Sequence, residues 1–509
     1  MTTWVRRLVT VSLVLSGCSQ PADQDVVRVG ADVDAESLDP RLQRNTTGFR
    51  VVNLIYDGLL QLDTNLQPVP GLAESWENPS PTIWVFHLRA NVRFHDGVSL
   101  TAADVVYTFE TILDPQLRAP QRTLYVPIDS IEAVDDRTVR FTLHEPFAPF
   151  LSYLDMGIVP QHLAEAGRNL GSMPVGSGPY RLRRWDKGSR VLLEANPDHW
   201  AGVPTVTRID VVLVPDNTAR AQAFEAGDLD LLQSPLAPQD IKRLAADPGF
   251  QNSMQPGLAI TYLNFNTKSP HLRDPMMRRA ISMLVDQETI VTQIYENTDD
   301  AAGSIFPPTS WGYSSEIAQA PFDPAGARQI LAELGWRDTD GDGVLDRDGR
   351  RLAFRLGTHS EDVNRVQTVE FLQHTWTQNG IAVNVEISDW PSFSARRDAG
   401  DYDVILLGWT QVVDPDRVTF EQLHSTGGLN WGGYRNRRLD RLLEVGRSAQ
   451  SREARASAYH DAARIIADEV PYYIISYQGY QVFFSHRIRG FEPNLRGLLR
   501  SLTRATLIP

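Results

Sequence analysis

The segment 209–231 has the sequence IDVVLVPDNTARAQAFEAGDLDL. Its first part, Ile209 to Val214, is a near-continuous apolar run of strand length, and Thr218 to Ala226 has a helical pattern that Gly227 closes. Leu229 to Leu231 is the next predicted strand. Strand, helix and strand in this order predict α/β architecture, in which helices cover both faces of a mostly parallel sheet.

The same order of secondary structure returns in the last third of the chain. Leu352 to Leu356 is a predicted strand, a helix runs from about Asp362 to Asn379, and Ile381 to Ile387 is the following strand. Tyr402 to Leu407 adds another strand. We therefore expect two α/β lobes, with a ligand cleft between them near the carboxyl ends of strands.

A different pattern lies between roughly residues 51 and 175. Apolar and polar residues alternate from Thr82 to Leu88, a capped helix is predicted to begin at Thr101, and residues 131–143 predict two strands around a turn. This segment predicts a compact α+β domain inserted into the first lobe. With 509 residues, the chain has the length of roughly three domains of about 150 residues each.

The first residues predict export and lipid attachment. Arg6 and Arg7 precede the apolar run Leu8 to Leu15, and Ser16-Gly17-Cys18 follows as a bacterial lipobox, whose cysteine is acylated after cleavage. The alternative is a membrane-embedded start, but this run is far shorter than the ~20 residues that a spanning helix needs. We expect a signal peptide over 1–17, an anchor at Cys18 and a polar linker over 18–25.

Composition excludes several functional classes. Cys18 is the only cysteine, so we expect no disulfide, no catalytic thiol and no cysteine metal site. A net charge of −14 makes nucleic acid a poor partner. No His-Glu-x-x-His or Gly-x-Ser-x-Gly motif is present, which argues against the alternative of a secreted hydrolase. We expect no enzymatic activity and no cofactor.

Several blocks of sequence resemble one family. Pro70 to Trp76, Trp84 to Arg89, Val92 to Gly97 and Leu100 to Val106 closely resemble the signature of the dipeptide-, oligopeptide- and nickel-binding family of ABC-transporter solute-binding proteins. Further matches occur in the family's order at Ser37 to Pro40, Tyr56 to Leu59, Gly176 to Tyr180, Tyr262 to Thr267, Asp274 to Ala280, Gly335-Trp336 and Gly408-Trp409. The resemblance covers essentially the whole mature chain.

The resemblance implies a two-lobed clamshell of the type II-like periplasmic-binding-protein kind, with the α+β domain inserted in the first lobe. We place lobe I at 26–50, 176–262 and 478–509, the inserted domain at 51–175 and lobe II at 263–477. Hinge strands are expected near residues 262 and 477. Closure around a solute that touches both lobes would be the working motion.

The resemblance also implies partners and location. We expect a monomer on the periplasmic or cell-surface side, anchored to the membrane by lipid, that delivers a peptide or peptide-like solute to ABC permease and ATPase subunits. Alternatives are an oligosaccharide or other non-peptide solute binder, or a sensor or chaperone with the same fold. Genomic neighbours that encode permeases and ATPases would favour transport.

Most of the signature is expected to be scaffold. Trp76, Trp84 and Phe94 are interpreted as core residues of the inserted domain, because large aromatic side chains usually lie in cores. Ser177 lies between Gly176 and Gly178, which does not match a nucleophile elbow, and is interpreted as part of a turn.

The ligand-contacting positions depart from those of peptide-binding relatives. The aspartate that binds a peptide's ammonium group is replaced by Val412, with Asp414 or Asp416 as substitutes only if the loop follows another path, and the carboxylate-binding arginine is replaced by His359. We therefore hypothesise that free dipeptides are not the best ligand. The candidate ligand-binding residues are Ser37, His359, Trp390, Gly408, Trp409, Thr410, Val412, Asp414 and Trp431.

Two further interpretations remain open. Trp390, Trp409, Trp431 and Tyr434 either stack against sugar rings or aromatic side chains, or pack within the protein. The string around Asp338, Asp340, Asp342 and Asp346 has part of an EF-hand pattern, but Gly349 stands where the bidentate glutamate is needed. We favour an acidic turn there over a calcium site.

Overall fold

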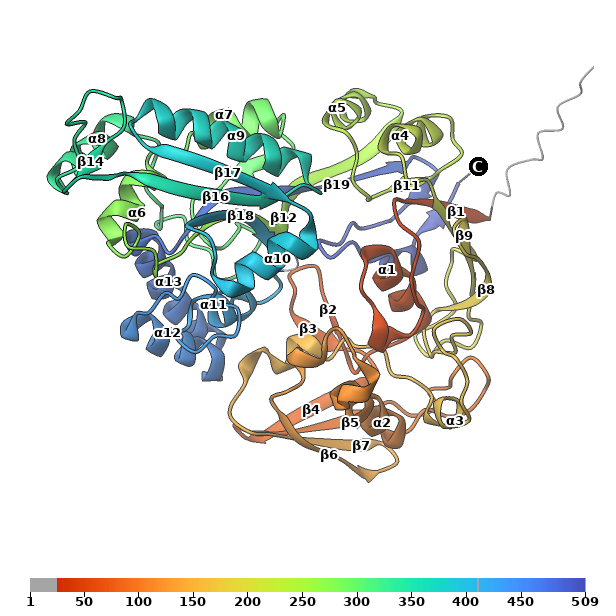
Figure 1. Cartoon of the computed structure of the whole chain (residues 1–509). Helices are drawn as coiled ribbons and strands as arrows, with labels where there is room; N and C mark the ends of the chain where they lie inside the picture. The colour runs from red at the N-terminus through yellow and green to blue at the C-terminus, as the bar shows by residue number, and fades with distance from the viewer. Residues whose placement is uncertain (1–24, 410–411, 509) are drawn as a thin grey trace, which may run out of the picture.

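The computed structural model describes residues 25–409 and 412–508. Its central feature is a mixed sheet shared by both lobes (Figure 1). The strands are β1 (Val26–Ala31), β8 (Tyr180–Asp186), β9 (Arg190–Ala195), β10 (Arg208–Leu213), β11 (Leu231–Leu232), β12 (Phe250–Phe265), β13 (Asp299–Ala301), β16 (Ala353–His359), β17 (Ala382–Ser388), β18 (Val404–Trp409) and β19 (Tyr472–Ser485). Their order is β17-β16-β18-β12-β19-β11-β1-β10-β9-β8, and β13 pairs with β19.

The predicted strand-helix-strand units are present. β1 pairs in parallel with β10 and β11, and β16 pairs in parallel with β17 and β18. The expectation of a mostly parallel sheet is wrong, because β12 and β19 run antiparallel to each other and to their outer neighbours, and β8 and β9 are also antiparallel additions. Local periodicity reports which face of a strand is buried, but not the direction of its partner.

Helices cover both faces of this sheet. In Figure 1, α9 lies on one side of β16 and β17, and α11, α12 and α13 lie on the other side. The helices are α1 (Thr46–Ile55), α4 (Asn217–Glu225), α5 (Pro238–Ala246), α6 (Pro275–Ser282), α7 (Gln287–Thr289), α8 (Pro324–Glu333), α9 (Val363–Gln378), α10 (Trp390–Ala399), α11 (Pro415–Leu423), α12 (Arg437–Ser448) and α13 (Arg452–Glu469). Gly227 and Gly380 follow α4 and α9 with φ of 78° and 83°, as expected for glycines that end helices.

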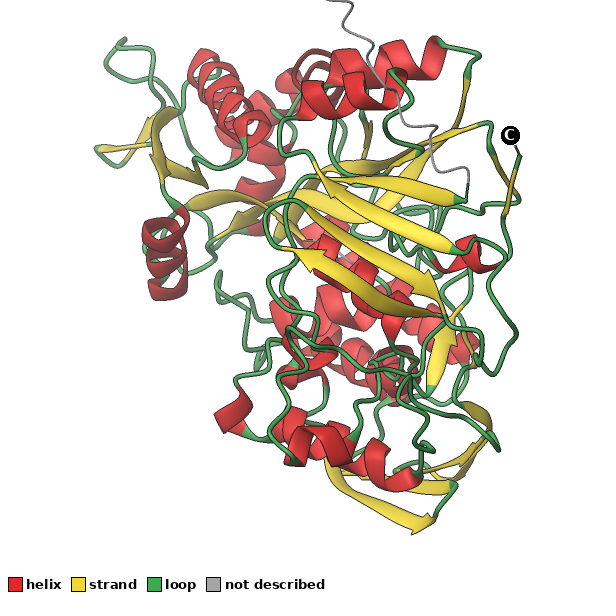
Figure 2. Ribbon diagram, turned by 90° about the vertical axis from the view of Figure 1, so that its right-hand side faces the viewer, coloured by secondary structure: helices red, strands yellow, loops and turns green. Residues whose placement is uncertain are grey.

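The inserted domain has its own sheet, in the order β4-β5-β7-β6, which Figure 2 shows apart from the large sheet. Its elements are β4 (Ala73–Ser80), β5 (Ile83–Leu88), β6 (Ile128–Asp135), β7 (Thr138–Leu143), α2 (Ala102–Leu113) and α3 (Gln161–Glu165). A capping box between Thr101 and Asp104 begins α2. Trp84 and Phe94 are buried in this domain's core and Trp76 packs against it, so the scaffold interpretation of these aromatic residues is confirmed.

The inserted domain and lobe I have separate hydrophobic cores. The core of the inserted domain begins at Leu59, whereas Ile55 and Tyr56 pack with β1 and β10 in lobe I. The predicted α/β class, with two lobes and an inserted α+β domain, is confirmed. Shorter elements are β2 (Leu60–Leu62), β3 (Pro68–Pro70), β14 (Asp346–Arg347), β15 (Arg350–Arg351), β20 (Ile488–Arg489), β21 (Thr506–Leu507) and short 3-10 or π turns.

The signal peptide and the anchor at Cys18 lie outside the described residues. Among the residues that the structure does describe, none of the helices is both long enough and apolar enough to cross a bilayer.

Candidate functional site

A cavity of about 520 Å³ lies where the two lobes, the long strands between them and the inserted domain meet. Every part of the protein contributes to its wall, so a molecule held there would contact both lobes and the inserted domain together. The lining residues are Asp32, Gln43, Arg44, Asn45, Thr46, Phe49, Arg50, Gln121, Leu124, Tyr125, Ser152, Tyr153, Asp155, Gln233, Ser234, Pro235, Gly257, Leu258, Ala259, Val413, Arg417, Gln478, Gly479, Tyr480, Leu495, Arg496 and Gly497.

The connecting strands themselves form part of the wall. The β12–β19 ladder has a register shift between Pro256 and Ile260, and Gly257 to Ala259 in this interruption face the cavity. A Cβ on Gly257 would lie 2.8 Å from the carbonyl oxygen of Gln478, so glycine is required for this close approach. Because a bulge bends a strand and interrupts its ladder, bending here would change the width of the cavity.

The N-terminal end of α1 is held rigidly at the cavity. Asn45 caps the helix by accepting a hydrogen bond from the amide of Gly48 at 2.8 Å. Gln43 donates from Nε2 to the carbonyl oxygens of Ser37 and Asp39, at 2.9 and 2.6 Å. These bonds fix the turn from which Arg50 reaches the cavity.

Arg50 is a buried cation for which the described part of the chain offers no carboxylate partner. Its side chain donates to the carbonyl oxygens of Gly497 and Gln233, at 3.1 and 2.8 Å, and to Ser234 Oγ at 3.3 Å. Only 6% of the residue is exposed. Burial lowers the pKa of Arg50, and Tyr480 and Asp32 offset part of that effect. Among the described residues, no carboxylate forms an ion pair with it.

Arg417 on α11 brings a second cation to the cavity from lobe II. It is half-buried, and its Nε is buried and has no hydrogen-bond acceptor among the residues that the structure describes. Its guanidinium makes no ion pair with any residue in the described ranges. A third arginine, Arg496, is already neutralised by an ion pair with Asp155.

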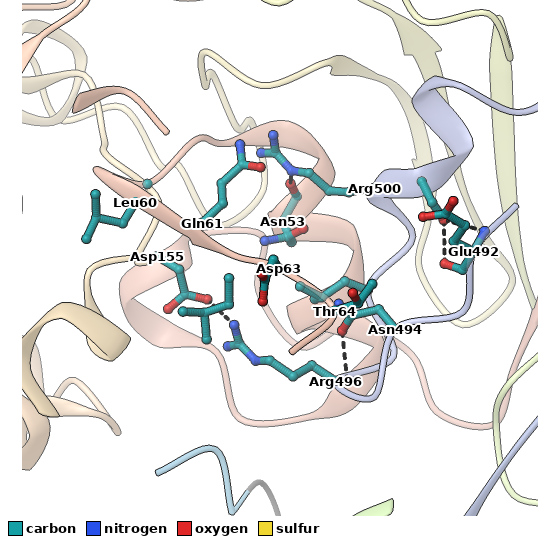
Figure 3. Close-up of a pocket in the computed structure, with 14 residues that line it drawn as sticks. Asn53, Leu60, Gln61, Asp63, Thr64, Asp155, Glu492, Asn494, Arg496 and Arg500 are labelled. Carbon is teal, nitrogen blue, oxygen red and sulfur yellow. Dashed lines mark hydrogen bonds and ion pairs between the residues drawn. The ribbon is translucent and has the colours of Figure 1, made fainter. Parts of the chain in front are cut away.

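The Asp155–Arg496 pair also borders a smaller cavity of about 140 Å³, shown in Figure 3. This cavity lies between β2 and the C-terminal segment. There, Arg500 donates from Nε to the carbonyl oxygen of Asn53 at 3.0 Å. The ion pair therefore forms a wall between the two cavities and ties the inserted domain to lobe I.

A buried polar cluster lies around Asp57, which is 0% exposed. Arg500 Nη1 lies 2.7 Å from this carboxylate, Trp200 Nε1 donates to it at 2.9 Å and Ser177 Oγ donates at 3.2 Å. Burial would raise the pKa of Asp57, but Arg500, His199 and Trp200 together hold it well below its usual range. The serine is enclosed and bonds directly to the carboxylate, which agrees with its interpretation as a structural turn.

Several candidate ligand-binding residues gather at one end of lobe II, where the parallel strands β16 and β18 end. The rings of His359 and Trp390 are 5.2 Å apart, and His359 Nε2 lies 3.0 Å from Arg365 Nη1. Burial and then Arg365 lower the pKa of His359, which favours neutral imidazole. A Cβ on Gly408 would overlap the Arg365 guanidinium, so glycine makes room for this arginine.

Two tryptophans of the candidate set belong to the same region. Trp409 and Trp431 are half-buried and pack against the core of lobe II, where Tyr434 is buried. Arg397 lies 4.1 Å from the Trp431 ring centroid and 5.5 Å from that of Trp390. Packing accounts for most of the Trp431 and Tyr434 surface, and Trp390 remains 39% exposed.

The remaining candidate residues that the structure describes form contacts within the protein itself. Val412 is 0% exposed and donates its amide to the carbonyl oxygen of Leu258 at 2.8 Å. Asp414 begins α11 as its N-cap and accepts from Arg455 at 2.6 Å. Ser37 Oγ accepts from the amide of Asp39 at 3.1 Å. Thr410 lies outside the described residues. Among the described residues, the cavity wall contains neighbours of this set, Val413 and Arg417, but not the candidates themselves.

The acidic string forms an exposed, hydrogen-bonded turn. Oxygen atoms of Asp338, Asp340 and Asp342 lie within 4.8 Å of one another. Asp346 instead accepts from the amide of Thr339 at 3.0 Å and from its hydroxyl at 2.8 Å. This geometry is typical of an acidic turn stabilised by its own backbone.

Sequence reasoning did not identify Arg50 and Arg417. Each is an isolated arginine within an ordinary helical pattern, which carries no motif. The one local signal near the cavity was a glycine inside a strand pattern at Gly257, which indicates a bulge or a close approach.

Comparison with known proteins gives the family. The model of bacterial extracellular solute-binding proteins, family 5 Middle, matches residues 67–431. Protein XP55 of Streptomyces lividans is 31% identical over 492 residues, covering 94% of this chain and 88% of that protein. Oligopeptide-binding protein AppA of Bacillus subtilis is 28% identical over 460 residues, covering 87% of this chain and 84% of that protein.

Solved structures agree with the sequence comparison. AppA in complex with a nonapeptide has a TM-score of 0.77 at 26% identity and covers 95% of this chain and 99% of its own. AgaA from A.tumefacien in complex with agropinic acid has a TM-score of 0.76 at 26% identity, with coverage of 95% and 99%. Members of this family are extracytoplasmic binding components of ABC transport systems and are not enzymes. The chain therefore belongs to the family 5 bacterial extracellular solute-binding proteins.

Proposed function

We propose that this protein captures a peptide or peptide-like solute in the 520 Å³ cavity and delivers it to the permease of an ABC importer driven by ATPase subunits. The observation that supports this proposal best is the origin of the cavity wall, which comes from both lobes and from the β12 bulge between them. A solute that touches both lobes stabilises the closed state by its differential affinity for that state.

We also propose that Cys18 anchors the protein to the membrane through lipid and that the protein acts as a monomer. The boundaries predicted for the lobes, 26–50, 176–262 and 478–509 against 263–477, belong to the same proposal. In this arrangement the anchor precedes β1 by a short polar linker, so the lobes can open and close beside the membrane.

The proposal retains the hypothesis that free dipeptides are not the best ligand. Val412 is buried and apolar, and the Asp414 carboxylate already accepts from Arg455, so neither compensates a peptide's ammonium group without rearrangement. Arg50 and Tyr480 are among the lining residues that a solute in the cavity would meet. The aromatic group around His359 and Trp390 is proposed as an outer contact for a longer solute.

The second candidate is a non-peptide solute. Uncharged hydrogen-bonding side chains and four aromatic rings in the wall suit a hydroxyl-rich molecule as well as a peptide backbone. Related proteins have been solved with a nonapeptide and with agropinic acid, so the family accommodates chemically different solutes. A sensor or chaperone role would use the same cavity without a permease partner.

Three measurements test this proposal. Native mass spectrometry of protein purified without refolding should show a co-purified solute at one molecule per chain. Isothermal titration with a panel of ordinary dipeptides should give dissociation constants weaker than micromolar, while small-angle scattering with the co-purified solute should show compaction. Micromolar or tighter dipeptide binding would refute the ligand hypothesis. Steady consumption of a compound without compaction would refute the binding function itself.

A further inference from the structure

We infer that the cavity selects a solute with net negative charge, and that Arg50 from lobe I and Arg417 from lobe II determine this specificity. The inference rests on the proposed function, because it concerns the same cavity and names the chemical class of its occupant. A carboxylate and a phosphate group share the required chemistry, since both accept charge-assisted hydrogen bonds from guanidinium.

The charges in the wall do not balance. Arg44, Arg50, Arg417 and Arg496 line the cavity, against only Asp32 and Asp155, which leaves two positive charges in excess. Asp155 forms an ion pair with Arg496 and neutralises it. The other three arginines in the wall then have only the Asp32 carboxylate to balance their charge. The whole chain has a net charge of −14, and a positive cavity is therefore a local arrangement that composition does not predict.

The guanidinium of Arg417 is incompletely paired by the described residues. Its Nε is buried without an acceptor, and among the described residues its guanidinium forms no ion pair. Its charge also acts on the phenol groups of Tyr125 and Tyr153, which line the same cavity and provide no counter-charge. An anionic ligand in the cavity would supply the counter-charge that Arg417 lacks among the described residues.

Arg50 is fixed where a ligand would meet it. Its three hydrogen bonds go to two backbone carbonyl oxygens and one hydroxyl, which hold the guanidinium in place without neutralising it. Leaving a charge buried and unpaired is unfavourable, so the cavity as described lacks a counter-charge for Arg50. Asp32 interacts with Arg50 at longer range and compensates only one of the free arginines.

Arg50 and Arg417 make closure of the lobes depend on the charge of the solute. Arg50 is carried by lobe I and Arg417 by lobe II, so closing the empty protein brings like charges toward one cavity. An anion placed between them changes this repulsion into attraction on both sides. The solute's charge therefore contributes to the differential affinity that closes the lobes.

Matched probe pairs test the inference by isothermal titration. Carboxylate probes are trigalacturonate against galactotriose and Ala-Glu-Ala against Ala-Gln-Ala, and phosphate is tested with glucose 6-phosphate against glucose. Anion-exchange fractions of a bacterial metabolite extract, neutral and acidic, complete the set, with compaction followed by small-angle scattering. We expect compaction and binding with an acidic fraction or acidic probe, at least about tenfold tighter than with the neutral counterpart.

Substitutions of the two arginines test whether the preference for acidic solutes comes from the cavity. Arg417→Gln should weaken binding of the acidic fraction or probe by about 10- to 100-fold, and Arg50→Lys should weaken it while keeping one positive charge. Arg438→Gln is the matched control, since Arg438 is exposed on α12 and its loss changes the net charge equally. We expect this control to bind as the unaltered protein does.

The outcomes separate the two proposals. Compaction with a neutral fraction as strong as or stronger than with the acidic one would overturn the inference and leave the binding function intact. Unchanged binding of the acidic probe by Arg417→Gln would also overturn it. If neither fraction compacts the protein, the proposed function fails, and the inference fails with it.

Discussion

Asp299 lies against the strand that connects the lobes, and its titration should be visible in stability. Its carboxylate accepts from Ser476 Oγ at 2.7 Å and from the amide of Gly479 at 3.4 Å. Burial raises the pKa of Asp299 from 3.8 to about 6, although these hydrogen bonds act in the opposite direction. The folded state therefore favours the protonated form, and stability is lost as pH rises from about 4 through about 6.

Asp299→Asn should remove the loss of folding stability that accompanies ionisation of Asp299. The difference between 3.8 and about 6 corresponds to roughly 3 kcal/mol at neutral pH, as an upper estimate. We expect denaturant unfolding to show the variant and the unaltered protein converging near pH 4 and the variant gaining stability up to pH 7. Asp228→Asn is the control, because Asp228 is exposed and is not among the groups that shift the pKa of Asp299. Parallel stability profiles for the unaltered protein and Asp299→Asn would contradict the assignment.

The β2–β3 hairpin forms an apolar contact across the cleft. Leu62 and Leu66 of the hairpin region pack with Leu258 of the β12 bulge and Val413 of lobe II. This cluster joins the inserted domain to the opposite lobe, so we expect it to stabilise the closed arrangement. Burial of one leucine side chain contributes about 1.5–3 kcal/mol when it is complete.

Leu62→Ala should therefore shift the molecule toward the open state. We expect a larger radius of gyration without solute, and weaker binding of the co-purified solute by about tenfold. Small-angle scattering and titration measure these effects. Val98→Ala is the control, since Val98 is 44% exposed in the inserted domain and takes no part in the contact across the cleft. If Leu62→Ala and Val98→Ala had the same radius of gyration without solute, the contact would not favour closure.

The proposed attachment of the protein to a membrane rests on Cys18, which lies outside the described residues. Cys18 is the only cysteine of the chain, and none of the described residues is a cysteine, so replacing it leaves every described contact in place. Cys18→Ser should abolish acylation and release the protein from the membrane fraction, with solute affinity unchanged. Mass spectrometry of the N-terminal peptide and cell fractionation measure this. A variant that stays in the membrane fraction would argue for another means of attachment.

Local patterns predicted much of the architecture. The helices α4 and α9 and the strands β10, β16 and β17 lie close to their predicted ranges, because apolar periodicity records which side of a segment is buried and glycines mark where helices end. The aromatic core of the inserted domain was predicted for the same reason.

Pairing and the cavity depended on contacts between distant segments. The antiparallel passage of β12 beside β19, and the bulge at Gly257 to Ala259, arise from two strands that must cross between lobes and return. The cavity joins Arg50, Arg417 and Gly497, which no periodicity connects. Amino-acid order thus specified the lobes and the inserted domain through local burial patterns. Only folding decided which charges share the cavity, because an electrostatic site depends on distances in space and not on separation along the chain.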